Sequence, residues 1–175
     1  MKLAEIRRRT GYDPNAQPSI RAATRTWVQS MHTRYSLALT LTLKQSLTVD
    51  TPKGTVRRSI TRQDCERIAQ RFQQKLNRAV FGKRAAEKYG KTLRYLPILE
   101  GEMSGKNLHL HFAVGGLPKH FKPKQFNDLV IEAKQHVKEV DHQHKVDIAD
   151  GGWLEYITKE TSTKHTDNVL WTLMK

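Results

Sequence analysis

The chain has 175 residues, 37% of them hydrophobic, and we expect one globular domain with a core, which excludes a disordered chain. The apolar runs are short, so we expect neither a membrane-spanning helix nor a signal peptide, and the single cysteine excludes a disulfide framework. A net charge of +14 and an isoelectric point near 10.1 favour a protein that binds nucleic acid.

The N-terminal part is basic and irregular, and we interpret residues 1–30 as an extension of a single domain that spans 1–175. Three consecutive arginines in the extension are candidates for contacts with a DNA backbone: Arg7, Arg8 and Arg9. A solvated basic face is the alternative interpretation of this run. A short helix is expected over Arg21–Met31.

The segment Tyr35–Lys44 alternates between leucines and small or polar residues, which predicts a half-buried strand. The polar face of this strand carries three candidates for DNA contact, namely Thr40, Thr42 and Lys44. Next, Ser46–Val49 and Thr55–Ile60 flank a Thr-Pro-Lys-Gly turn and predict a flexible hairpin.

From Thr61 to Phe81 the apolar residues recur at spacings of three and four, which predicts an amphipathic helix with Thr61 as its N-cap. Cys65 belongs to the apolar face, so we interpret it as a core residue in a reducing, cytoplasmic setting and not as a nucleophile. The polar face is basic, and Arg67 and Arg71 are candidates for DNA backbone contact.

The second half of the chain alternates strands with helices. After a basic connection over Gly82–Thr92, the pattern predicts strands at Leu93–Glu100, Leu108–Val114 and Lys145–Ile148, and helices at Pro123–Glu139 and Gly151–Glu160. Antiparallel strands with helices packed on them give an α+β fold with a central antiparallel sheet.

Two histidines, His109 and His111, alternate with apolar residues in one of these strands and therefore emerge on the same face. A hairpin with the preceding strand would bring Glu100 to this face, with Glu102 as the competing carboxylate. Two imidazoles and a carboxylate suit Mg²⁺ or Mn²⁺, and ligand type alone also allows Zn²⁺. The alternative is a pair of histidines that are solvated or satisfied in the core.

Tyr156 and Lys159 are three residues apart on the last helix and share one of its faces. A phenol beside a metal-bound phosphate can act as a nucleophile, and a nearby lysine would favour the phenolate or contact the phosphate. The alternative interpretation of Tyr156 is a core tyrosine.

Three motifs in this order resemble the HUH endonucleases, in particular rolling-circle replication initiators with a single catalytic tyrosine. The motifs are the Thr-Leu-Thr strand within Leu37–Leu43, the His-hydrophobic-His strand, and Tyr156–Lys159. The resemblance implies a palm-like sheet of the ferredoxin or RRM kind. It also implies a metal on His109, His111 and Glu100, and attack by Tyr156 on single-stranded DNA that leaves a 3′-hydroxyl and a covalent 5′-phosphotyrosine.

The resemblance further implies nicking and rejoining at a plasmid or phage replication origin, at a hairpin or other nick site. The chain has no Gly-x-x-x-x-Gly-Lys-Ser/Thr loop, so a helicase would come from the host. Conjugative relaxases are one alternative, with Tyr12 and His120 in their roles, and single-tyrosine transposases are another, although those usually carry glutamine where Lys159 stands. A non-catalytic module for single-stranded nucleic acid is the alternative outside the enzymes.

Overall fold

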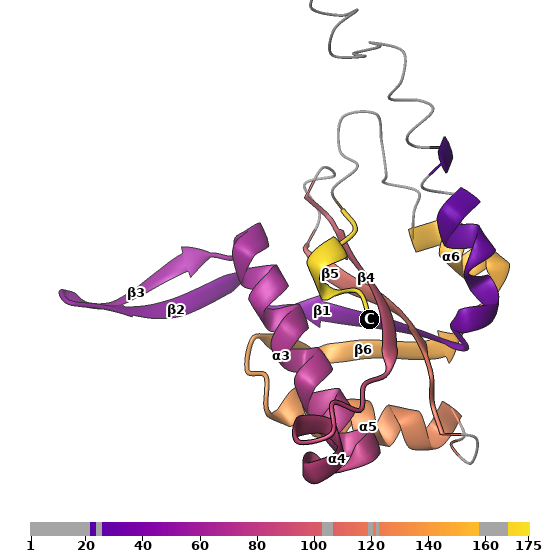
Figure 1. The fold of residues 1–175 in the computed structure, drawn as a ribbon. Helices are drawn as coiled ribbons and strands as arrows, with labels where there is room; N and C mark the ends of the chain where they lie inside the picture. The colour runs from indigo at the N-terminus through magenta and orange to yellow at the C-terminus, as the bar shows by residue number, and fades with distance from the viewer. Residues whose placement is uncertain (1–21, 24–25, 103–106, 119–120, 122, 158–167) are drawn as a thin grey trace, which may run out of the picture.

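The computed structural model describes residues 22–23, 26–102, 107–118, 121, 123–157 and 168–175. Its centre is an antiparallel sheet with the strand order β4-β5-β1-β6. These strands are β1 (Leu37–Leu43), β4 (Arg94–Glu100), β5 (His109–Gly115) and β6 (Val140–Ile148). Helices pack on the sheet, so the predicted α+β class is confirmed (Figure 1).

Two helices connect the strands of the sheet. The chain runs β1-α3-β4-β5-α5-β6, with α3 at Arg62–Phe81 and α5 at Pro123–Gln135. This βαββαβ order, with β1 inserted between β5 and β6, is the split βαβ arrangement of ferredoxin-like folds. Residues that are far apart in the sequence are thereby placed side by side at the centre of the sheet.

The larger core lies between the sheet and the helices α3 and α5. The leucines of β1 point into it, as the alternating pattern predicts, and they are buried together with Phe72 of α3, Phe112 of β5 and Phe126 of α5. The ring centroids of Phe72 and Phe112 are 5.7 Å apart. This apolar layer determines which side chains of each strand face α3. The alternate side chains point to the opposite face of the sheet.

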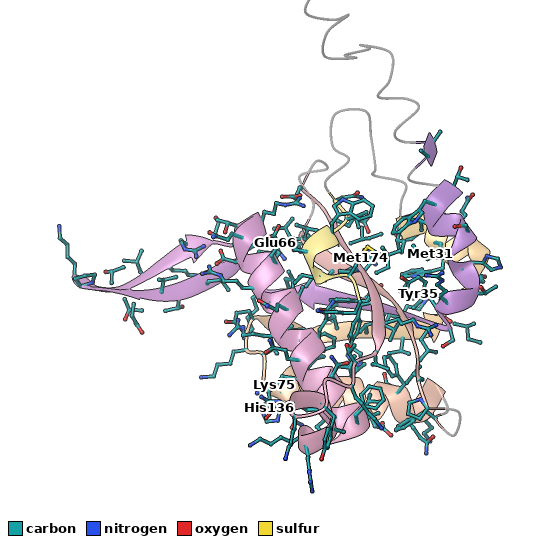
Figure 2. All side chains as sticks on the ribbon, viewed as in Figure 1. Met31, Tyr35, Glu66, Lys75, His136 and Met174 are labelled. Atoms are coloured by element: carbon teal, nitrogen blue, oxygen red, sulfur yellow. The ribbon has the colours of Figure 1, made fainter. Side chains whose placement is uncertain are left out.

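A second apolar cluster covers part of the opposite face. Leu96 and Ile98 of β4 pack there with the helical residues 26–30 and with α6 (Gly151–Ile157). Figure 2 labels Met31 and Tyr35, which belong to this cluster, and Met174, which packs against it. The outer edge of β4 is covered by residues 168–175, since Leu99 N donates to Asn168 O at 2.8 Å and Leu170 N donates to Pro97 O at 2.9 Å.

A two-stranded ribbon projects from this body (Figure 1). It consists of β2 (Ser46–Thr51) and β3 (Gly54–Ser59), so the predicted hairpin is confirmed. We call residues 46–59 the arm. The turn at its tip uses Gly54 at a φ of 115°, which a residue with a side chain rarely adopts.

Most predicted boundaries lie within two residues of those in the structure, but three segments differ more. The predicted connection after α3 contains a short helix, α4 (Lys83–Glu87), whose Lys-Arg-Ala-Ala-Glu sequence consists of strong helix formers. Helix α5 ends at Gln135 because the amides of His136 and Val137 bond carbonyls three residues back, which tightens the chain into a turn. Strand β6 begins earlier than predicted because it pairs with the whole of β1, from Leu43 opposite Val140 to Leu37 opposite Ile148.

The described residues contain no helix that is long and apolar enough to cross a membrane. Two short 3-10 helices are also present, η1 (His32–Arg34) and η2 (Trp171–Leu173).

Helix α3 begins at the predicted N-cap, Thr61, through a reciprocal capping box with Asp64. The Asp64 carboxylate accepts from Thr61 N at 3.0 Å and from Arg58 at 2.5 and 2.9 Å, and it also bonds Arg67. The Arg58 hydrogen bonds, followed by those of Thr61 and Arg67, hold the pKa of Asp64 well below its ordinary value of 3.8. One buried carboxylate therefore joins the arm to the start of α3.

Replacing this carboxylate by Asp64→Ala is expected to lower the free energy of unfolding at pH 7 by about 2–3 kcal/mol. The substitution removes the helix cap and leaves two guanidinium groups without their carboxylate partner. The folded pKa is depressed, so the stabilisation is fully present above the unfolded pKa and is lost as the pH falls through the folded one. The difference between the two proteins should therefore shrink below about pH 4. Urea unfolding at several pH values measures this.

Asp50→Ala is the matched control, because Asp50 is an exposed carboxylate of the arm that accepts a hydrogen bond from Thr55 at 3.0 Å. It should change the stability by no more than about 0.5 kcal/mol. An equal loss in both variants would show that Asp64 has no special role in anchoring α3.

Candidate functional site

Strands β4 and β5 place Glu100 beside the histidine pair, as the predicted hairpin requires. Glu100 lies opposite His109, and His111 lies opposite Ile98 on the same face. Gly101 follows the strand with a φ of 109°, and a Cβ atom there would lie 2.5 Å from the carbonyl oxygen of Asn107. The chain can therefore turn closely after Glu100 because the next residue is glycine.

Strand β1 completes this face on the other side of β5. Thr40 lies opposite His111, and Thr42 lies opposite His109. The Thr40 hydroxyl is 3.0 Å from Nδ1 of His111. The DNA-contact role predicted for Thr40 is untested, and in the structure its hydroxyl orients a histidine.

His111 is the most enclosed member of the site, with 3% of its surface exposed. Its Nε2 atom contacts Oε2 of Glu100, so the imidazole is held between Glu100 and Thr40. A hydroxyl can donate or accept. Thr40 can therefore satisfy Nδ1 whether Nε2 donates a proton to Glu100 or presents a lone pair to a cation.

The donor set suits a divalent cation in its chemistry. His109, His111 and Glu100 share one face of two adjacent strands, and imidazole and carboxylate are ordinary ligands of such ions. Among the described residues no three histidine, cysteine or carboxylate groups are placed so that they could hold a metal ion, and Glu100 bonds His111 directly. A cation would take the place of that hydrogen bond.

Glu102, the competing carboxylate, has a different partner. Its Oε2 is 2.5 Å from Nη1 of Arg62 at the start of α3. The structure thus brings Glu100, and not Glu102, into contact with the histidine pair.

Helix α6 places Tyr156 against the same histidine. Asp150 caps the helix by accepting from Trp153 N at 2.7 Å, and Leu154 and Ile157 are buried against the sheet. The other side of the helix presents Trp153 and Tyr156, whose rings stack with centroids 5.7 Å apart. Both rings lie edge-on to His111, at 5.6 and 6.2 Å between centroids.

Among the described tyrosines, Tyr156 is the one that is both exposed and close to the histidine pair. It is 46% exposed, whereas Tyr35 and Tyr95 are buried, and burial raises the pKa of both phenols. Tyr89 is exposed but follows α4, where it contacts Arg84 and Lys88. The core-tyrosine interpretation of Tyr156 is therefore wrong.

Cys65 is fully buried in the apolar core, as predicted. Burial, with smaller contributions from nearby carboxylates, raises the pKa of its thiol to about 12. A thiol in this environment is a poor nucleophile.

A pocket of about 380 Å³ opens between α6 and the outer half of the sheet. Trp153 and Tyr156 form one wall, and Thr40, Lys145 and Asp147 lie on the strand side. Lys145 is 3.0 Å from Asp147, and this hydrogen bond lowers the pKa of the carboxyl. The pocket therefore combines an aromatic surface with charged groups, next to His111.

The remaining predicted residues are not part of this site. Arg67 and Arg71 pair with Asp64 and Glu139, and together with Lys44 they line a different groove beside the arm. Several predicted residues lie outside the described part of the chain: Arg7, Arg8, Arg9, Tyr12, His120 and Lys159.

The sequence did not reveal the part that Trp153 plays in the site, although its spacing of three from Tyr156 was a usable signal. No family model matches this chain, and no curated protein or solved structure is significantly similar to it.

Proposed function

We propose that the protein is a metal-dependent nicking endonuclease and strand transferase of the HUH type that acts on single-stranded DNA. The observation that carries the proposal is the meeting of Tyr156 with His111 at 6.2 Å between ring centroids, while His111 contacts Glu100. The proposed nucleophile, from a helix, and the proposed metal ligands, from a hairpin distant in sequence, thus lie on one face of the sheet.

In the proposed reaction the Tyr156 hydroxyl oxygen attacks the phosphorus of a DNA phosphodiester. The Oη–P bond forms and the P–O3′ bond breaks; the phenol proton leaves to solvent, and the departing oxygen takes up a proton to become a 3′-hydroxyl. The 5′ end of the DNA stays on the tyrosine. Attack by a 3′-hydroxyl on this ester reverses the step and rejoins the strand.

The difficulty of this step is electrostatic, since a phenolate and a phosphodiester are both anionic. A divalent cation bound by His109, His111 and Glu100 would neutralise charge on the phosphate and polarise it. With a cation on Nε2 of His111, the Thr40 hydroxyl would accept the Nδ1 proton and so hold the imidazole in place. The net charge of +14 supports the approach of a polyanion to the whole molecule.

The pocket beside Tyr156 supports single-stranded DNA as the substrate. Unpaired bases stack on exposed aromatic rings, and the pocket offers Trp153 and Tyr156. Trp27 and Trp171 form a further exposed pair, with ring centroids 5.5 Å apart. In the biological setting that we propose, the protein nicks a plasmid or phage replication origin in the cytoplasm and borrows a host helicase.

The test is covalent capture. The full chain is incubated with a labelled pool of single-stranded oligonucleotides, with Mn²⁺ or with EDTA, and is run on a denaturing gel. A DNA-linked protein band that requires the metal supports the proposal. The pool must be rich enough to contain a target. If such a pool yields no covalent band but gives a salt-sensitive shift on a native gel, the protein is a binding module.

The aromatic surfaces favour that binding module as the second candidate function, because they would serve single-stranded nucleic acid without any chemistry. The same capture assay would also detect a relaxase or a transposase. The bound DNA ends and the identity of the attached tyrosine would distinguish these enzymes.

A further inference from the structure

Two paired strands form the floor and one side of the pocket beside Tyr156. Ala38 of β1 lies opposite Asp147 of β6, and Thr40 lies opposite Lys145. The leucines of β1 point into the core against α3, so Ala38 and Thr40 emerge on the opposite face, together with their partners on β6. The small side chain of Ala38 leaves room there. The volume of about 380 Å³ suits one planar group better than a length of DNA strand.

The charges of the pocket favour a nucleobase over a phosphate group. Among the described residues that line it, the charged ones are one lysine and two aspartates, namely Lys145, Asp147 and Asp150. Carboxylates repel a phosphodiester, and the ammonium group is already 3.0 Å from one of them. A neutral base meets no such repulsion, and it can stack on the aromatic wall of Trp153 and Tyr156.

The Asp147 carboxylate is oriented by two hydrogen bonds. Its Oδ1 accepts from Ile148 N at 3.0 Å, and its Oδ2 accepts from Nζ of Lys145 at 3.0 Å. These bonds, that of Lys145 first, lower the pKa of the Asp147 carboxyl, so the group is ionised at neutral pH. A carboxylate has about two acceptor positions on each oxygen, and these bonds use one on each. The side chain is 58% exposed, so a ligand can reach the second position on each oxygen.

Guanine matches these two side chains better than the other DNA bases do. Its Watson–Crick edge presents two adjacent N–H donors, at N1 and N2, beside the acceptor O6. With N1–H on Oδ2 and N2–H on Oδ1 of Asp147, O6 lies beside the Lys145 ammonium, and lysine is an ordinary partner of guanine O6. Adenine and cytosine each present one amino group beside a ring-nitrogen acceptor. Thymine presents one N–H between two acceptors.

We propose that this pocket selects a guanine in the single-stranded DNA, with Asp147 and Lys145 as the residues that determine the specificity. The inference rests on the proposed function in taking single-stranded DNA as the ligand, and it adds the identity of a base close to the phosphate that Tyr156 attacks. His109, His111 and Glu100 do not line the pocket, so the base and the proposed cation use different side chains.

The test measures binding of the full chain to short oligothymidylates that carry guanine, adenine, cytosine or thymine at one central position. Binding is followed by fluorescence anisotropy in EDTA, so that no metal-dependent chemistry takes place. We expect the guanine strand to bind about 10-fold or more tightly than the other strands, which is the discrimination of one good bidentate contact. Asp147→Asn should bring all the strands within about 2-fold of one another, and Lys145→Gln should reduce the preference for guanine at least about 3-fold.

Hypoxanthine in place of guanine tests a single group of the base, because it lacks the N2 amino group and keeps N1–H and O6. The wild type should bind the hypoxanthine strand about 5-fold more weakly than the guanine strand, since one hydrogen bond to the Asp147 carboxylate is lost. Asp147→Asn should bind both strands about equally.

The matched control is Asp141→Asn, which removes the same charge from the same strand at a position outside the pocket. It should keep the wild-type preference for guanine. Equal binding of all the strands by the wild type, an undiminished preference in Asp147→Asn, or an equal loss of preference in the control would each overturn the inference. Free deoxyguanosine monophosphate that binds as tightly as the guanine strand would also overturn it, because the pocket would then serve a mononucleotide.

The same measurements separate this inference from the proposed function. If the wild type prefers guanine but forms no covalent adduct with Mn²⁺, the nicking function fails and the guanine pocket stands. If the adduct forms while all the strands bind equally in EDTA, the guanine pocket fails and the nicking function stands.

Discussion

Tyr156→Phe is expected to abolish the covalent DNA adduct, with a loss of at least about 1000-fold in the rate of strand cleavage. The substitution removes one oxygen atom, which is the proposed nucleophile. It keeps the ring that stacks on Trp153 at 5.7 Å and lies edge-on to His111. Binding of single-stranded DNA should therefore change little, so the loss would appear in the chemical step. Denaturing gels and equilibrium binding on the same oligonucleotide measure the two effects separately.

Tyr89→Phe is the matched control, since Tyr89 is the other exposed tyrosine among the described residues and contacts Arg84 and Lys88. It should form the adduct at the wild-type rate. Persistence of the adduct in Tyr156→Phe would transfer the nucleophile to another tyrosine. Mapping the attached residue to Tyr12 would then favour a relaxase-like enzyme over a replication initiator.

The fold was predictable where one segment carries its own signal. Four alternating leucines specify the buried side of β1, and the spacing of three and four together with Thr61 specifies α3. Segments whose structure depends on a partner were predicted less well. Strand β6 is long because it pairs with β1 across the sheet, and its own exposed, charged sequence carries a weak strand signal.

The candidate site was also predictable only where the contacts are local in sequence. Glu100 could be placed beside the histidines because their strands follow one another closely in the sequence, so the pairing is local. The bond between Thr40 and His111 joins residues 71 positions apart and depends on the register of β1 against β5, which no local pattern specifies. The stack of Trp153 on Tyr156 follows helical spacing, but its contact with His111 requires α6 to dock on that face of the sheet.

Glu100 is the residue whose substitution tests the proposed metal site. Glu100→Gln is expected to weaken Mn²⁺ binding at least about 100-fold and to reduce adduct formation with it, because an amide oxygen replaces the only anionic ligand of the proposed set. Glutamine can still accept a hydrogen bond from Nε2 of His111, so the packing around the imidazole should survive. Calorimetric titration of Mn²⁺ into the DNA-free protein gives a measurement that does not depend on catalysis.

The chain supplies its own control for this experiment in a second His-x-His pair, His142 and His144, on β6. These histidines alternate in the same manner, but Nδ1 of His144 lies 3.0 Å from Nζ of Lys134. Burial and then the charge of Lys134 lower the pKa of the His144 imidazole. A neighbouring cation opposes metal binding, so His142→Gln should leave Mn²⁺ affinity unchanged. If Glu100→Gln binds Mn²⁺ as tightly as the wild type while His142→Gln does not, the metal belongs to β6. The contact between Glu100 and His111 would then be a structural hydrogen bond, and Tyr156 would need another source of charge neutralisation.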